Sequence, residues 1–226
     1  MKNIDKITSV NITITFILTL LFVNFGILYF YIEQINLYSS METGAQVLES
    51  DITAVEKYIT ALSLIYVVGF LFTGMFFVYW LTNAYLRIKT IFPNLVGTNF
   101  QILIAWFIPI IGLYKPYEIM DDLYTHAKQL LVKHLNVKNS LLNKGILHFW
   151  WFLWIFDNIL ILLASKFDKK AIDVEEIMFS TKFHIVEIIF SIILCLVTAK
   201  MLFNYSRVES EVNSIVDIEY DQNFTK

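Results

Sequence analysis

Four apolar segments, each long enough to cross a lipid bilayer, constrain this chain more than any other feature. The hydrocarbon core of a bilayer is about 30 Å thick and an α-helix rises about 1.5 Å per residue, so about 20 apolar residues span it. The segments cover residues 10–31, 59–81, 146–164 and 183–203. We therefore predict an all-α membrane protein with four transmembrane helices, whose first partner is the lipid bilayer itself.

The composition agrees with this fold class and excludes several functions. Hydrophobic residues make up 57% of the chain and charged residues 16%, against about 45–50% and about 25% in a soluble domain. The net charge of −3 gives no basic field for a nucleic-acid partner. Cys195 is the only cysteine, so the chain has no internal disulfide, and zinc sites built on cysteine need more thiols. We predict no metal site and no cofactor.

The first apolar segment is read as a retained membrane anchor. It is about twice as long as the apolar part of a usual signal peptide, and no cleavage site with two small residues follows it. Residues 1–204 are therefore assigned to the membrane domain. Residues 33–57 are expected to connect the first two spans, with a short surface helix at 46–57.

A fifth apolar run, at residues 102–113, contains only 12 residues. Such a helix would cover about 18 Å, which is too short for a span, and runs of this length favour re-entrant or buried segments. Pro109 also removes a helical hydrogen bond to the carbonyl of Ala105. We predict a broken, partly inserted segment over 95–114. The alternative is a full span that starts near Leu95, which the polar residues between 97 and 101 weaken.

An amphipathic helix is predicted over residues 116–135. Pro116 suits the first turn of a helix, and the acidic residues come early and the lysines late, which complements the helix dipole. Apolar residues recur on one face. This helix is expected on the membrane surface or at the end of the bundle, where Arg87 could pair with Asp121 or Asp122. The acidic tail, residues 205–226, is expected to be loose beyond one or two helical turns.

Orientation follows from the distribution of lysine and arginine, which are enriched in cytoplasmic loops. With four spans and both termini cytoplasmic, eleven basic residues lie inside and five outside, with Lys200 at a boundary. The outer five are Lys57, Lys166, Lys169, Lys170 and Lys182. A full crossing by the broken segment would give eight against eight. The bias therefore favours four spans in a cytoplasmic (inner) membrane, with both termini inside.

The region around the broken segment resembles a bacterial membrane family, the domain of unknown function 4328. Its pattern W-F-x-P-I-x-x-L-x-x-P-Y is matched by Trp106, Phe107, Pro109, Ile110, Leu113, Pro116 and Tyr117, with Trp80 before it and Trp150 and Trp151 after it. The resemblance covers about residues 66–163. This chain departs from the family in the order of Asn83 and Arg87, and in Tyr124, where tryptophan is frequent. The resemblance implies an integral membrane protein with no established activity.

Asp157 is the residue most suggestive of function, because it lies near the middle of the third span. A carboxylate there costs at least about 2.5 kcal/mol on insertion scales, and such residues face a partner or a wet cavity. One reading is structural: a hydrogen bond to Asn158, Asn24 or Asn83 would hold helices together. The others are proton or ion handling, and partner binding.

Two further polar sets are candidates for chemistry. His184 and Glu187 share a face of the fourth span and could share a proton or bind a metal, or form an ordinary interfacial pair. Glu118, Asp122 and His126 recur every four residues. They spread over about 12 Å of helix axis, too far to reach one ion, so a solvated face is the preferred reading.

No nucleotide-binding, zinc-protease or serine-hydrolase pattern occurs in the sequence. The first functional hypothesis is a non-enzymatic scaffold or partner-binding subunit, which docks a protein through the cytoplasmic motif helix and the acidic tail. The alternative is a small channel or transporter that uses the broken segment and Asp157. The sequence leaves the oligomeric state open.

Overall fold

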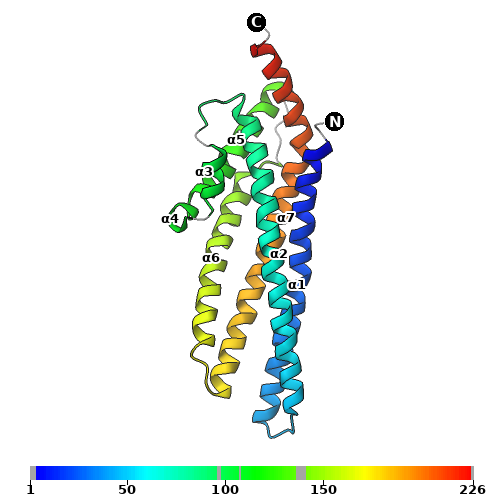
Figure 1. The fold of residues 1–226 in the computed structure, drawn as a ribbon, viewed down its shortest axis with the longest axis vertical. Coiled ribbons are helices and arrows are strands. Elements are labelled where there is room, and N and C mark those ends of the chain that lie inside the picture. Colours follow the sequence, from blue (N-terminus) through cyan, green and yellow to red (C-terminus); the bar gives the residue numbers. More distant parts are fainter. Residues whose placement is uncertain (1–3, 96–97, 107, 136–140, 225–226) are drawn as a thin grey trace. The chain divides into compact units, whose positions relative to one another are not determined.

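Four long helices and three short ones make up the computed structural model, which describes residues 4–95, 98–106, 108–135 and 141–224 (Figure 1). The long helices are α1 (Ile4–Glu42), α2 (Glu49–Lys89), α6 (Lys144–Asp168) and α7 (Val174–Phe224). The short ones are α3 (Asn99–Ile104), α4 (Pro109–Gly112) and α5 (Lys115–Leu135). The described residues contain no strand, and each long helix is long and apolar enough to cross a membrane. This confirms the helical fold class and the four candidate spans.

The long helices extend well past the apolar segments, which corrects the predicted connections. The connection expected over 33–57, with a surface helix at 46–57, is mostly the end of α1 and the start of α2. Gly44, between them, has a φ of +81°, a conformation that glycine adopts at little cost. Helical hydrogen bonding continues past the apolar segments on both sides of this turn because no proline interrupts it there.

The acidic tail is also helical, where the sequence suggests a loose segment. α7 continues to Phe224, and Val208, Val212, Ile215 and Val216 are all buried. Their spacing of three and four residues places them on one helix face. The acidic residues between them lower the average hydropathy and conceal this apolar face. The tail is therefore an amphipathic continuation of the fourth span.

The chain divides into two compact units, and each long helix contributes to both. Unit 1 contains residues 1–15, 73–151 and 198–226, and unit 2 contains residues 16–72 and 152–197. The α3–α4 segment and α5 thus belong to unit 1. Asp157 belongs to unit 2.

In unit 2, α1 and α2 form an antiparallel pair. Phe16 stacks on Phe72 with ring centroids 6.2 Å apart, and Phe30 stacks on Tyr58 at 4.8 Å. A Cβ at Gly69 would come within 2.9 Å of a leucine side chain of α1. The small residue therefore allows the two helices to approach closely.

The same unit holds a second antiparallel pair, α6 and α7. Phe156 of α6 contacts Phe190 of α7 at 4.9 Å, and Phe167 contacts Phe179 at 5.2 Å. At the start of α7, the Asp173 side chain accepts a hydrogen bond from the Glu176 N–H. This cap satisfies one of the free N–H groups of the first turn.

In unit 1, the ends of α2 and α7 run parallel and are joined by polar contacts. The rings of Trp80 and Tyr205 meet edge to face at 5.3 Å. Two turns further along α2, Arg87 forms a 2.6 Å ion pair with Asp217 and donates a 2.9 Å hydrogen bond to the Asn213 carbonyl. The helical tail thus provides the partners of Arg87.

The predicted pairing of Arg87 with Asp121 or Asp122 is therefore wrong. Asp121 forms a 2.9 Å ion pair with Lys144, and Asp122 accepts a 3.4 Å hydrogen bond from the Tyr85 hydroxyl. The prediction failed because it assigned the tail no structure. Because α7 extends through the tail, the tail lies next to Arg87, where the prediction placed α5.

α5 buries its apolar face within unit 1. The buried side chains are Ile119, Met120, Leu123, Tyr124, Ala127, Leu130 and Leu131. The Tyr124 hydroxyl donates a 2.8 Å hydrogen bond to the Met201 carbonyl of α7. Its apolar face is thus buried against unit 1, and its placement on the membrane surface or at the end of the bundle stays a prediction.

Glu219 of α7 fixes the far end of α5, beyond the apolar stretch 183–203. Its Oε1 atom lies 2.6 Å from Lys133 Nζ and 2.6 Å from His134 Nε2. Burial acts to raise the pKa of Glu219, but the hydrogen bonds and charges of Lys133 and His134 outweigh it and lower the pKa. A lowered carboxyl pKa stabilises the fold above the unfolded-state pKa of about 4.3, and this stabilisation is lost as the pH falls through the folded-state pKa.

We expect unit 1 to lose stability below about pH 5, and Glu219→Gln to remove part of this dependence. The contribution should be on the order of 0.5–1 kcal/mol, because ion pairs near solvent are screened. Thermal melting of the full-length protein in nanodiscs between pH 3 and pH 7 measures it. Glu211→Gln, an exposed acid on the same helix, is the control. Parallel pH curves for wild type and Glu219→Gln would contradict the assignment.

Candidate functional site

The proline-containing segment is broken into two short helices in unit 1. α3 begins with a capping box, in which the Thr98 side chain and the Gln101 side chain each accept from the other residue's backbone N–H. α4 starts with Pro109 at its first turn, where the missing N–H costs nothing. A Cβ at Gly112 would lie 3.3 Å from the Ala105 carbonyl oxygen. α4 thus folds back against the end of α3. The partial insertion of residues 95–114 into the membrane stays a prediction.

The tryptophans of the motif gather around Phe77 of α2. The Phe77 ring lies 5.8 Å from Trp80, 5.4 Å from Trp106 and 6.1 Å from Trp150, centroid to centroid. Aromatic pairs in tilted or edge-to-face geometry stabilise a fold beyond the area they bury. Phe107 lies outside the described residues. The motif therefore builds an aromatic cluster that joins α2, the broken segment and α6.

The remaining motif residues attach α4 and α5 to α6. The Trp151 indole N–H donates a 3.1 Å hydrogen bond to the carbonyl of Leu113, which ends α4. The Tyr117 hydroxyl lies 2.9 Å from His148 Nε2. These contacts, with buried Pro116 at the start of α5, indicate that the motif positions α5. They provide no arrangement for catalysis.

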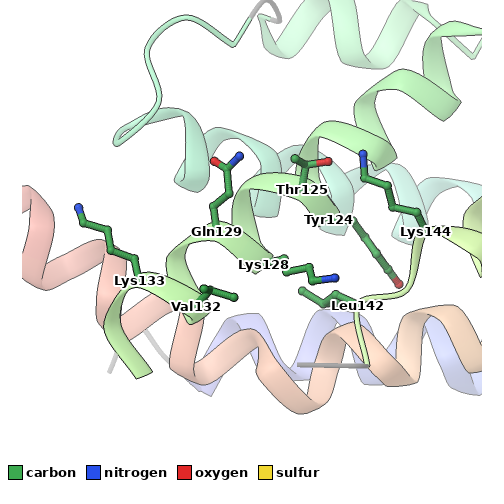
Figure 2. Close-up of a pocket in the computed structure, with 8 residues that line it drawn as sticks. All are labelled: Tyr124, Thr125, Lys128, Gln129, Val132, Lys133, Leu142 and Lys144. Carbon is green, nitrogen blue, oxygen red and sulfur yellow. The ribbon is translucent and has the colours of Figure 1, made fainter. Parts of the chain in front are cut away.

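A basic groove lies on the side of α5 that these contacts leave open (Figure 2). Its volume is about 420 Å³. Three lysines, Lys128, Lys133 and Lys144, surround it. The other lining residues are Tyr124, Thr125, Gln129, Val132 and Leu142. Tyr124 and Leu142 are buried, so the groove has an apolar floor and a cationic rim. The sequence analysis did not single it out, because its lining comes from two separate parts of the sequence, residues 124–133 and residues 142–144.

The polar stripe of α5 forms no metal site. Glu118 pairs with Lys115 at 2.7 Å, and the His126 ring nitrogen Nδ1 lies 2.8 Å from the backbone carbonyl oxygen of Asp122. Burial raises the pKa of Asp122, which the nearby His126 and the hydrogen bond from Tyr85 partly oppose. Within the described ranges, no group of three His, Cys, Asp or Glu side chains could hold a metal ion.

Asp157 is buried in unit 2, with a hydroxyl partner on α7. Its side chain is 4% exposed and accepts a 2.8 Å hydrogen bond from Ser191. Tyr66 of α2 also hydrogen-bonds to Ser191. Glu187 lies one helical turn before Ser191 on the same helix. Tyr66 of α2, Ser191 of α7 and Asp157 of α6 thus form a chain of hydrogen bonds.

The asparagines expected to hold Asp157 are engaged elsewhere. Asn158 is exposed and donates to the Trp154 carbonyl of its own helix, and Asn83 donates to the Tyr79 carbonyl. Asn24 is buried and its amide nitrogen lies 3.9 Å from Cys195 Sγ. Ser191 was missed, although it follows Glu187 by four residues and so lies on the same face of the span.

His184 contacts two carboxylates. Its Nε2 lies 2.8 Å from Asp168 Oδ2, and its Nδ1 lies 3.8 Å from Glu187 Oε2. The Tyr31 ring of α1 stacks on the imidazole at 5.0 Å. The expected neighbourhood of His184 and Glu187 is present, and Asp168 is an additional partner from the end of α6.

Comparison with known proteins identifies a family for this chain. The family model described as Domain of unknown function (DUF4328) matches residues 44–207, which is more than half of the chain. No curated protein and no solved structure matches this chain.

Proposed function

Because the chain belongs to the family of Domain of unknown function (DUF4328), a description that assigns no activity, we propose a function from the geometry of the chain itself. The protein is a non-enzymatic, multi-pass subunit of a bacterial cytoplasmic membrane that binds another protein through the basic groove of α5. The observation that carries this proposal is the apolar floor ringed by three lysines. An acidic partner segment with an apolar side chain complements both features.

The rim lysines differ in how much of their charge is already paired. Lys133 and Lys144 form ion pairs with Glu219 and Asp121. Lys128 is exposed and makes no salt bridge with any residue that the structure describes. The Lys133 side chain is 69% exposed, so it can contact a partner carboxylate while it stays paired with buried Glu219. The Lys144–Asp121 pair is partly exposed, and pairs near solvent contribute little stability, so a partner carboxylate can replace it at small cost.

The acidic tail does not serve as the docking surface in this proposal, although the sequence suggested it. Its acids act within unit 1: Glu209 accepts from the Trp80 indole N–H at 3.2 Å, Asp217 pairs with Arg87, and Glu219 pairs with Lys133. The docking role therefore falls to the basic groove, which α5 lines together with Leu142 and Lys144.

The contacts of unit 1 also support four spans with both termini cytoplasmic. Arg87 precedes the broken segment and α5 follows it, yet both contact the same terminal part of α7. A full crossing by the broken segment would place them on opposite sides of the bilayer. In a Cys195→Ala background, we expect cysteines at Thr98 and Lys115 to react with the same impermeant reagent from the cytoplasmic side. Labelling from opposite sides would refute this topology.

Site-specific photo-crosslinking in native membranes tests the docking function. A photoreactive residue at Gln129 should give a discrete protein adduct that Lys128→Glu removes, because the reversed charge repels an acidic partner. The control variant is Lys166→Glu in unit 2, which should leave the adduct in place. Adducts to lipid alone, or a protein adduct insensitive to Lys128→Glu, would contradict the proposal.

A channel or transporter is the second candidate, favoured by buried Asp157 and its hydroxyl partner. The broken segment belongs to unit 1 and Asp157 to unit 2, so the support for this alternative comes from Asp157 itself. Ion or proton flux in proteoliposomes that Asp157→Asn leaves unchanged would remove it.

A further inference from the structure

We propose that the partner bound by the basic groove is a second copy of this chain, which presents the exposed side of its own α7 tail. This side, which we call the tail face, consists of Glu211, Ser214, Ile218 and Asp221. The inference rests on the docking function proposed above and names the occupant of the same groove. The groove stays the docking surface, and the tail face of the neighbouring copy is the segment that it binds.

The tail face combines acidic residues with an exposed apolar side chain. Its members follow one another at intervals of three or four residues, which places them on one side of the helix. Ile218 is 51% exposed, and Asp221 follows it about one turn later. The side chain of the adjacent Asp217 is 62% exposed. One copy therefore presents the kind of segment that the groove complements, an acidic one with an apolar side chain.

The groove and the tail face lie at the same level of unit 1. At one end of the groove Lys133 pairs with Glu219, the residue after Ile218, and at the other end Tyr124 donates to the Met201 carbonyl of α7. Two copies inserted in one membrane with the same orientation hold these levels at the same depth. Because two different surfaces meet, copies related by rotation about the bilayer normal can close into a ring.

One copy cannot fill its own groove with this face. Glu219 is buried and contacts Lys133 of α5, whereas Ile218 is exposed and lies about 100° away around the helix. α7 is one helix from Val174 to Phe224, so Ile218 cannot turn toward α5 unless Glu219 leaves its lysine. The tail face therefore needs the groove of a separate copy.

Water surrounds Ile218 in the proposed topology. The residue follows the apolar stretch 183–203 by 15 positions, which is about 22 Å of helix. The headgroup layer extends only about 5–8 Å beyond the hydrocarbon core, so lipid does not cover this side chain. A single exposed isoleucine is common on protein surfaces. This one lies among acidic residues and level with an apolar groove, where burial by a neighbouring copy stabilises it.

The charges of the two surfaces are complementary. The rim of the groove carries Lys128, Lys133 and Lys144 (Figure 2), and all three charged residues within one turn of Ile218 are acidic. Arg207 lies on the same side of α7 but about three turns away from Ile218. Complementary charges select and orient a partner, while a buried apolar anchor supplies most of the affinity.

Photo-crosslinking tests the identity of the partner. A photoreactive residue at Gln129 of the full-length protein in native membranes should give an adduct of twice the mass of the chain. Mass spectrometry should place the link within residues 208–224 of the second copy. An adduct to a different protein, or to another segment of the second copy, would overturn this inference and leave the docking function standing. Adducts to lipid alone, or none, would refute both.

Ile218→Lys tests the tail face itself. Lysine removes the apolar side chain and is repelled by the lysine rim, so the adduct between two copies should fall by about tenfold or more. Ile172→Lys is the matched control, because Ile172 is 90% exposed and belongs to unit 2, and it should leave the adduct unchanged. An adduct that persists in Ile218→Lys would contradict the proposal. If this variant unfolds unit 1, the position of the link in the wild-type adduct still decides.

Discussion

Removal of residues 208–226 is expected to abolish the stable fold of unit 1. The removed segment contains Val208, Val212, Ile215 and Val216, which are all at least 96% buried. Burial of each such side chain stabilises the fold by about 1.5–3 kcal/mol. The truncation also removes Asp217 and Glu219, the partners of Arg87 and α5. The combined loss is of the order of the about 5–15 kcal/mol that stabilises a whole domain.

Tryptophan fluorescence during thermal melting in nanodiscs measures this effect selectively. Four of the five tryptophans, Trp80, Trp106, Trp150 and Trp151, belong to unit 1. Removal of residues 223–226 alone is the control, because it keeps every one of these buried side chains. A truncated chain that melts with the same transition as the control would show that the tail is dispensable, as a loose segment would be.

The spans were predictable from the sequence because a single length criterion decides them. A run of about 20 apolar residues has few alternatives to a membrane-crossing helix, whatever its neighbours are. The helical break at Pro109 was predictable for a similar reason, since proline cannot donate the hydrogen bond that a continuous helix requires. In both cases the residues of the segment itself decide its structure, without contacts from distant parts of the chain.

The features that depend on tertiary neighbours could not be predicted in the same way. The tail mixes Glu209, Glu211 and Asp217 with a buried apolar face, so its average polarity resembles that of a disordered end. Asp168 lies 16 positions before His184 in the sequence, and only the antiparallel packing of α6 and α7 brings them together. Ser191 could have been found by extending the face of His184 and Glu187 by one turn.

Replacement of Trp151 by alanine is expected to destabilise unit 1 by about 3–5 kcal/mol, the usual cost of truncating a buried tryptophan. The indole packs against Trp150 and Tyr117 and donates to the Leu113 carbonyl at 3.1 Å. Trp151→Phe keeps most of the apolar volume but removes the N–H. It should cost only about 1 kcal/mol from the lost hydrogen bond, with a further penalty if the carbonyl stays dry.

Phe152→Ala provides the matched control, because Phe152 is the next residue on the same helix and is 59% exposed. Its truncation should change the melting temperature little. Hydrogen exchange locates the effect: Trp151→Phe should accelerate exchange in residues 108–117 and leave the central part of α7 unchanged. If Trp151→Ala and Phe152→Ala destabilised the protein equally, the tryptophan would not anchor the end of α4. The family motif would then need a role other than positioning α5, since this hydrogen bond is its direct link between the broken segment and α6.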